Sequence, residues 1–191
     1  MNITPADRIL EIQEYYFSKK LREVAELNAQ GKDIINLGIG SPDKMPSDKA
    51  LDTLNEVAHQ PNAHGYQSYQ GIPELRKAFS NFYKRWYGVD LDPNKVILPL
   101  IGSKEGVFFL SLTFINPGDG VLVPNPGYPT YTSASKILGA RIINYDLNEE
   151  NGWQPDFKKL EKMDLSGVKM MWTNYPNMPT GAPATMDLYE R

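Results

Sequence analysis

The chain has 191 residues, of which 41% are hydrophobic and 11% aromatic, so it can bury a sizeable core as one domain, with or without an appendage. Its formal net charge is −3 and it has no long run of like charges, which argues against nucleic acid as a partner. No apolar stretch approaches the length of a membrane span and the first residues do not resemble a signal peptide, so we expect a cytoplasmic protein with no membrane partner. The sequence has no cysteine, and His59 and His64 lack a plausible set of ligands, so we expect no disulfide and no metal site.

Residues 1–46 are interpreted as an N-terminal arm. One helix is expected to begin at Thr4, its cap, and to end at Gly31, with a change of face or a break near Ser18. Residues 33–37 are strand-like and lead into a stretch rich in turn residues.

Helices and strands alternate from residue 47 onward. Ser47 is expected to cap a helix, and residues 73–87 show the clearest helical pattern, with Gly88 just beyond its end. The remaining expected elements are helices at 104–115, 129–138 and 155–162 and strands at 96–101, 121–124, 141–145 and 168–173. This alternation predicts an α/β fold with a mostly parallel sheet covered on both faces. The helix at 104–115 is apolar all round, so it should be buried on every side, in part by another subunit.

The segment Gly102-Ser103-Lys104-Glu105-Gly106 turns directly from an expected strand into a helix. Unpaired backbone N–H groups and the helix macrodipole favour an anion at such a start, where Ser103 adds a hydroxyl donor and Lys104 a positive charge. The alternative is an ordinary serine cap beside a solvated lysine, and the pentapeptide alone favours that alternative. Neither G-x-x-x-x-G-K-[ST] nor G-x-G-x-x-G after a strand is present, which argues against a nucleotide site.

Five motifs in order resemble those of class I/II aminotransferases, the fold-type I enzymes that use pyridoxal 5′-phosphate. They lie at residues 38–43, 66–71, 102–106, 125–129 and 176–181. The sequences of residues 69–76 and 100–106 are most similar to those of the branch that contains the LL-diaminopimelate aminotransferases. The resemblance implies that residues 47–191 form the first half of a three-layer α/β/α large domain, which binds the cofactor, and that residues 1–46 are an arm and small-domain segment.

The resemblance also implies roles in holding the cofactor. Ser103 and Lys104 match positions that bind its phosphate, and Tyr128 matches the aromatic residue that stacks on its pyridine ring. Tyr66 matches a tyrosine that reaches the phosphate of the neighbouring subunit in a homodimer. The alternatives are a tyrosine packed in a proline-rich turn for Tyr128 and a plain loop aromatic for Tyr66.

Two residues match positions near the substrate. Gly40 matches a backbone position close to the substrate carboxylate, where a side chain would collide, although a simple turn glycine is the alternative. Tyr15 matches a tyrosine that contacts substrate in the diaminopimelate branch, although a core residue on a helix face is the stronger alternative.

The chain departs from the family pattern at Met178, which occupies the place of the motif asparagine. In the family that asparagine donates a hydrogen bond to the phenolic oxygen of the cofactor, and a methionine side chain has no donor. Asn177 or Asn174 could replace it, and our hypothesis is that Asn177 does so in part.

The function implied is transfer of an amino group between an amino acid and a 2-oxo acid. The lysine that forms the Schiff base, the aspartate at the pyridine nitrogen and the arginine at the α-carboxylate all follow the 176–181 loop in the family, whereas this chain ends ten residues after Gly181. We therefore assign no catalytic residue here, interpret the chain as the N-terminal half of an aminotransferase, and expect it to be inactive alone. The alternative is a non-catalytic relative or an inert fragment, a binding or regulatory module on the same fold.

Overall fold

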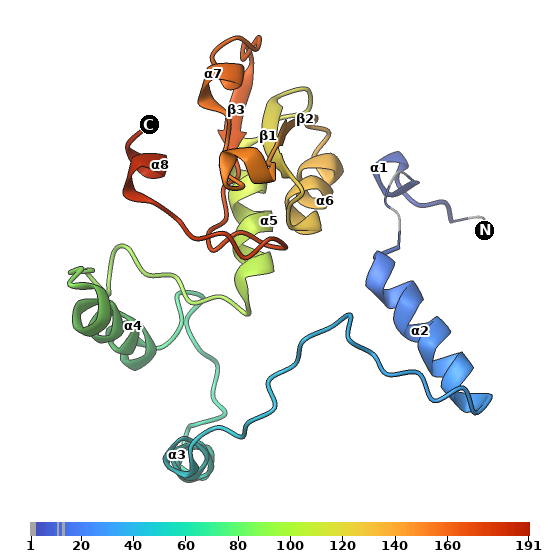
Figure 1. Ribbon diagram of the computed structural model, residues 1–191. Helices are drawn as coiled ribbons and strands as arrows, with labels where there is room; N and C mark the ends of the chain where they lie inside the picture. The colour runs from blue at the N-terminus through green and yellow to red at the C-terminus, as the bar shows by residue number, and fades with distance from the viewer. Residues whose placement is uncertain (1–2, 11, 13) are drawn as a thin grey trace. The chain divides into compact units, whose positions relative to one another are not determined.

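The computed structural model describes residues 3–10, 12 and 14–191 (Figure 1). Its contacts divide the chain into two compact units. One unit holds Leu100–Arg191 together with the first residues of the chain, and the other is Glu14–Pro99. The boundary after residue 46 stays a prediction.

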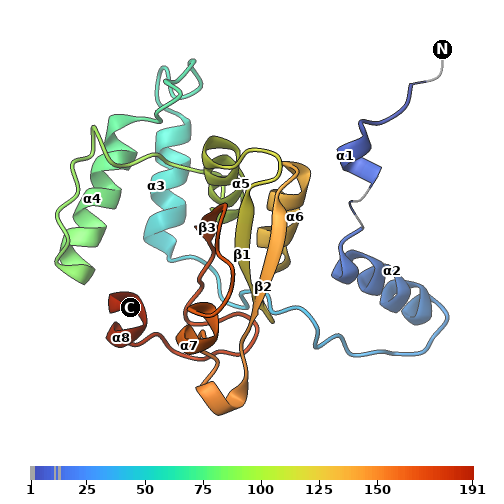
Figure 2. The ribbon, with the colours of Figure 1, turned by 90° about the horizontal axis from the view of Figure 1, so that it is seen from above.

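The first unit is built on a three-stranded parallel sheet. The central strand β1 (Gly120–Asn125) pairs with β2 (Arg141–Asp146) on one side and β3 (Val168–Met171) on the other. The register with β2 is unbroken, and Figure 2 shows these two strands side by side, whereas the register with β3 shifts between Gly120 and Val121. The predicted parallel sheet is confirmed.

Helices cover this sheet on both faces. They are α5 (Ser103–Phe114), α6 (Pro129–Ile137) and α7 (Phe157–Leu160). On one face Val121 and Val123 pack with Tyr131 of α6 and with Val107 of α5. On the other face Leu122 packs in a cluster that includes Leu160 of α7. Successive residues of a strand point to opposite faces, so the apolar run of β1 supplies both cores and the expected three layers are present.

Three short helices complete the first unit. They are α1 (Asp7–Leu10), the 3₁₀ turn η1 (Glu149–Asn151) and α8 (Met186–Glu190). The last two were not expected from the sequence. Both η1 and α8 begin at a polar N-cap residue. The side chain of Asn148 accepts the N–H of Asn151 in η1, and that of Thr185 accepts the N–H of Leu188 in α8.

The second unit contains three longer helices. They are α2 (Tyr16–Ala29), α3 (Asp48–Ala58) and α4 (Pro73–Tyr87). As predicted, Ser47 caps α3 by accepting the N–H of Ala50, and Gly88 ends α4 in the left-handed conformation at φ 69°. Gly31, with φ 81°, follows the end of α2, which confirms the predicted end of the first long helical segment.

A buried arginine stabilises the turn before α4. Arg76 is 8% exposed, and its guanidinium donates to the backbone carbonyls of Pro93 at 2.8 Å, Gln70 at 3.2 Å and Gly71 at 2.5 Å. A buried charge is costly unless its donors are satisfied, so these three carbonyls allow the arginine to join two loops of this unit.

The helix expected to start at Thr4 is two helices. The first begins at Asp7, so the prediction that Thr4 is the cap is wrong, and the second begins at Tyr16, just before the expected break near Ser18. Tyr15 has ψ 125°, an extended value that separates the two helices. Ser18 itself is helical, and its hydroxyl donates to the Glu14 carboxylate at 3.2 Å.

The strands expected at 33–37 and 96–101 do not form in the described chain. Both segments are irregular, and Ile35 is 80%, Leu37 91% and Ile101 95% exposed. A strand needs a neighbour to accept and donate its backbone hydrogen bonds. Neither segment pairs with a strand of the described residues, so apolar composition alone does not produce a strand there.

The helix α5 is only partly buried. Ser111 is fully buried, whereas Phe109, Leu110, Leu112 and Phe114 are 46–58% exposed. The expectation of burial on every side is therefore wrong for this chain, since the sheet covers one side of a helix that is apolar all round. Burial of the rest by another subunit stays a prediction.

None of the described helices is long and apolar enough to cross a membrane. The expected cytoplasmic location stays a prediction.

Gly127 gives a direct test of the connection that follows β1. A Cβ atom added to Gly127 would lie 2.5 Å from the carbonyl oxygen of Pro124, which is backbone and cannot move aside cheaply. We expect Gly127→Ala to lower the free energy of unfolding by about 1–3 kcal/mol in urea titrations. Gly40→Ala is the matched control, because a Cβ there meets no atom within 4 Å, and equal losses in the two variants would contradict this account.

Candidate functional site

The carboxyl edge of the sheet brings three of the predicted segments to one side of the first unit. The loops that follow β1 and β3 leave the same edge, because the two strands are parallel neighbours. The helix α5 leads into the start of β1, so it runs antiparallel to that strand. Its 12 residues span about 18 Å and the six residues of β1 about 20 Å, which places the first turn of α5 near the same edge.

The first turn of α5 is open. Gly102 is the N-cap residue, with φ 87°, and as a glycine it has no side chain to make a capping hydrogen bond. The carboxylate of Glu105 instead accepts the N–H of Ile101 at 2.6 Å, outside the helix. The backbone N–H groups at a helix start whose N-cap is a glycine, together with the helix dipole, favour an anion.

Lys104 and Tyr128 lie close together. The Nζ atom of Lys104 is 5.9 Å from the centroid of the Tyr128 ring. Ser103 and Lys104 are exposed and Tyr128 is half-buried, so the positive charge and one aromatic ring are both reachable from solvent. The structure brings these predicted residues together on one edge, where a small anionic ring compound could contact both.

The end of β1 is held by polar contacts. Asn125 donates from its side chain to the Asp146 carboxylate at 3.0 Å, and its carbonyl accepts the N–H of Leu147 at 2.8 Å. The hydrogen bond from Asn125, followed by that from Lys159, lowers the pKa of Asp146 below its usual range. The Asp146 carboxylate accepts from Asn125 at the start of the loop that leads to Tyr128.

Asn177 is buried within its own loop. It is 3% exposed, and its side-chain oxygen accepts the hydroxyl of Thr180 at 2.8 Å while its amide donates to the carbonyl of Asn174 at 3.4 Å. Met178 is 45% exposed, and its N–H donates to the side chain of Asn174. The longest of these contacts is the one from the Asn177 amide, so that donor is the least firmly engaged.

Three other predicted site residues belong to the unit Glu14–Pro99. Tyr66 is fully exposed. Tyr15 precedes α2, is 45% exposed and has its ring 5.6 Å from that of Phe17, so it is not a core residue on a helix face. Gly40 has room for a Cβ atom within the chain, so the chain itself does not require glycine at this position.

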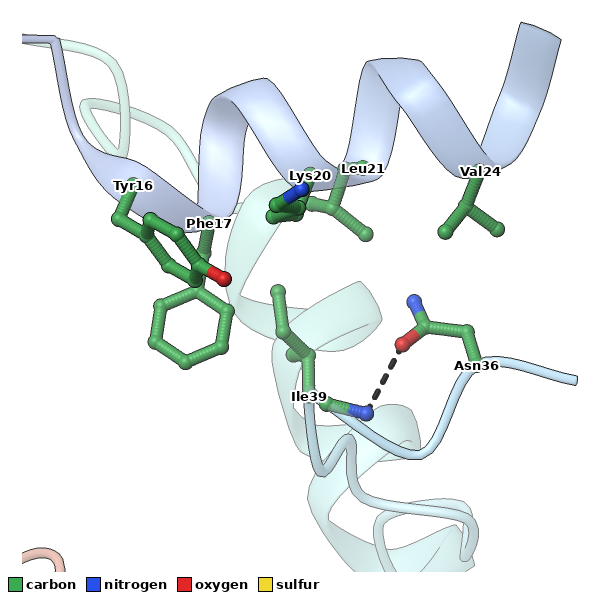
Figure 3. Close-up of a pocket in the computed structure, with 8 residues that line it drawn as sticks. Tyr16, Phe17, Lys20, Leu21, Val24, Asn36 and Ile39 are labelled. Atoms are coloured by element: carbon green, nitrogen blue, oxygen red, sulfur yellow. Dashed lines mark hydrogen bonds between the residues drawn. The ribbon is translucent and has the colours of Figure 1, made fainter. Parts of the chain in front are cut away.

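An apolar cavity of about 200 Å³ lies in the same unit, between α2 and residues 36–39 (Figure 3). Tyr16, Phe17, Leu21 and Ile39 are among the residues that line it, and the side chain of Asn36 accepts the N–H of Gly38 at 2.9 Å. Lys20 is already paired with Glu23 at 2.6 Å. The cavity therefore offers no ready group for an anionic ligand, and we assign it none.

Two aromatic residues beside Tyr128 were missed by the sequence analysis. Tyr131 contacts Tyr128, and Trp172 stacks on Tyr131. A signal for the first exists in the sequence, since Tyr128 and Tyr131 are three apart at a helix start. Trp172 could not be found this way, because it lies far along the chain, directly after β3.

The described residues contain no group of His, Asp or Glu side chains able to hold a metal ion. His59 and His64 are exposed, and one ring nitrogen of each donates to a backbone carbonyl at 2.8 Å: Nδ1 of His59 to Asn55 and Nε2 of His64 to Ala58.

Comparison with known proteins shows which family this chain resembles. The family model for aminotransferase class I and II matches residues 32–191. The chain is 40% identical to an LL-diaminopimelate aminotransferase of Halothermothrix orenii over 97% of this chain and 48% of the relative. It is 41% identical to transaminase BacF of Bacillus subtilis over 100% of this chain and 48% of that protein.

Solved structures of aminotransferases have a fold similar to that of this chain. Apo-BacF of Bacillus subtilis superposes with a TM-score of 0.90 at 40% identity, over 99% of this chain and 48% of that one. An alanine aminotransferase of Pyrococcus furiosus gives 0.85 at 30% identity, over 98% and 48%. The chain thus spans about half the length of the relatives it matches. On the extent of these matches, the chain belongs to the class I and II aminotransferase family.

Proposed function

We propose that the protein is an aminotransferase that uses pyridoxal 5′-phosphate to move an amino group between an amino acid and a 2-oxo acid. The observation that carries the proposal is the uncapped first turn of α5 with Lys104 beside the ring of Tyr128. Membership of the family and the names of the relatives, LL-diaminopimelate aminotransferase and transaminase BacF, support it.

The residues present fit this cofactor. A phosphate suits the N–H groups of the open helix turn, the hydroxyl of Ser103 and the charge of Lys104. A pyridine ring suits the face of Tyr128, which would shield one side of the ring from water. When bound, the cofactor supplies an electron sink for bond breaking at the amino-acid α-carbon.

Asn177 is proposed as the donor to the phenolic oxygen, in place of the asparagine that Met178 replaces. Its amide could exchange the 3.4 Å contact with Asn174 for a cofactor oxygen, whereas its side-chain oxygen would keep the hydroxyl of Thr180. The buried position of Asn177 supports a fixed orientation for this donor.

The remaining roles belong to the Glu14–Pro99 unit. We propose that Tyr66 contacts the phosphate of a neighbouring subunit in a homodimer, which agrees with its complete exposure. We propose that Gly40 and Tyr15 contact the substrate, the former by leaving room for a carboxylate. In this proposal residues 1–46 form an arm and small-domain segment and residues 47–191 the first half of the cofactor-binding domain.

A non-catalytic relative is the second candidate, favoured by Met178. Its thioether cannot donate a hydrogen bond, and its side chain is 45% exposed. A binding or regulatory module would retain cofactor affinity without amino-group transfer.

Removing the charge of Lys104 tests the phosphate site. We expect Lys104→Ala to weaken the affinity for pyridoxal 5′-phosphate about tenfold while leaving that for pyridoxal, which lacks the phosphate, unchanged. Isothermal titration of the purified protein measures both. Lys136→Ala, which removes a lysine from the last turn of α6, is the control. An equal loss for both ligands, or none for either, would count against the site.

Amino-group transfer separates the two candidate functions. The protein, at the full length that its gene encodes, is incubated with the cofactor, a panel of 2-oxo acids and a panel of amino donors that includes LL-diaminopimelate. An aminotransferase forms one new amino acid for each donor consumed, detected by mass spectrometry, and only when cofactor is present. Tight cofactor binding without transfer from any donor would support the non-catalytic relative instead.

A further inference from the structure

We propose that Tyr131 and Trp172 are positioning residues that hold the ring of Tyr128 in the orientation that receives the cofactor. The proposal rests on the proposed function, in which Tyr128 contacts the pyridine ring. Neither residue needs to touch the cofactor, since both act through Tyr128.

Tyr131 contacts the ring of Tyr128 directly. The two ring centroids are 5.7 Å apart and the planes meet at 85°, an edge-to-face arrangement that aromatic pairs favour. Tyr128 is the N-cap residue of α6 and Tyr131 lies one turn later, with its N–H donating to the carbonyl of Tyr128 at 3.2 Å. Tyr131 is 7% exposed and belongs to the apolar core that contains Val121 and Val123, so it offers the ring of Tyr128 a fixed surface to pack against.

Trp172 holds Tyr131 in turn. Its ring stacks on that of Tyr131 at 5.0 Å with an interplanar angle of 13°. The backbone of Trp172 is bound on both sides: its N–H donates to Leu122 at 2.9 Å, and its carbonyl accepts the hydroxyl of Tyr145 at 2.6 Å. Burial raises the pKa of the Tyr145 hydroxyl, so this donor keeps its proton over the ordinary pH range. The three rings therefore connect the central strand to Tyr128.

The indole nitrogen of Trp172 shows what this residue contributes. It is buried and has no hydrogen-bond partner among the described residues. A buried unpaired donor is unfavourable, so the N–H group does not explain a tryptophan at this position. The ring surface does, because it covers the ring of Tyr131.

A fixed Tyr128 ring matters because stacking is directional. A side chain free to rotate would lose rotamer freedom on binding and weaken the complex, whereas a pre-oriented ring avoids that cost. Phosphate binding at α5 does not depend on the orientation of this ring. Loss of the support should thus affect binding of the ring of the cofactor and spare binding of its phosphate.

The test measures two affinities on the purified protein, for pyridoxal 5′-phosphate and for inorganic phosphate, the latter as a competitor. We expect Tyr131→Leu to weaken cofactor affinity about 3- to 10-fold with phosphate affinity unchanged. Tyr131→Phe keeps the ring, and no described hydrogen bond of the hydroxyl is lost, so wild-type affinity is expected. A purely structural role would lower both affinities together or neither, and either result would overturn the proposal.

A second pair of variants covers the case in which Tyr131→Leu does not fold. Trp172→Met fills the space without a ring and should reproduce the selective loss, whereas Trp172→Phe retains an aromatic face and should restore most of the affinity. The near-ultraviolet circular dichroism of the bound cofactor should weaken in parallel with the selective loss.

Tyr128→Leu separates this proposal from the proposed function. If it leaves cofactor affinity unchanged, the assigned role of Tyr128 is wrong. If it weakens affinity while the ring-deleting variants of Tyr131 and Trp172 do not, only the positioning role is wrong.

Discussion

The pairing of β1 with a parallel neighbour on each side is the constraint on which the first unit depends. Val121, Leu122 and Val123 are 0–4% exposed, so apolar cores form on both faces of the strand. With both edges bonded and both faces covered, a one-residue shift of the strand would move every side chain to the wrong face. Its end at Asn125 is therefore fixed, and so is the start of the loop that carries Tyr128.

The candidate site combines two features, each of which alone is weak evidence for a ligand site. A helix start binds anions in many contexts, and a half-buried tyrosine by itself indicates little. Here the connection from α5 into β1 places the open helix turn and the end of the strand near one edge, and Lys104 lies beside the ring of Tyr128. The charge, the backbone donors and the aromatic face are then suited to one ligand that is both anionic and planar.

The parts predicted correctly from the sequence were those governed by local chemistry. The caps at Ser47 and Gly88 and the helices after residue 103 needed only nearby residues. The strand expectation at 96–101 failed because a strand depends on a partner that local sequence does not reveal, and no described strand pairs with this segment. The stacking of Trp172 on Tyr131 could not be predicted for a related reason, since the two residues are 41 positions apart in the sequence. Motif order assigned Lys104 and Tyr128 to one cofactor, and the fold places the two side chains beside each other, as that assignment requires.

The central claim is that the first turn of α5 and the ring of Tyr128 form one site for a phosphorylated pyridine. A crystal structure of the protein with pyridoxal 5′-phosphate tests it most directly. Our account predicts that the phosphate accepts hydrogen bonds from the backbone at Ser103 and Lys104 while the pyridine ring lies against Tyr128. Cofactor bound with its phosphate away from this helix turn would contradict it.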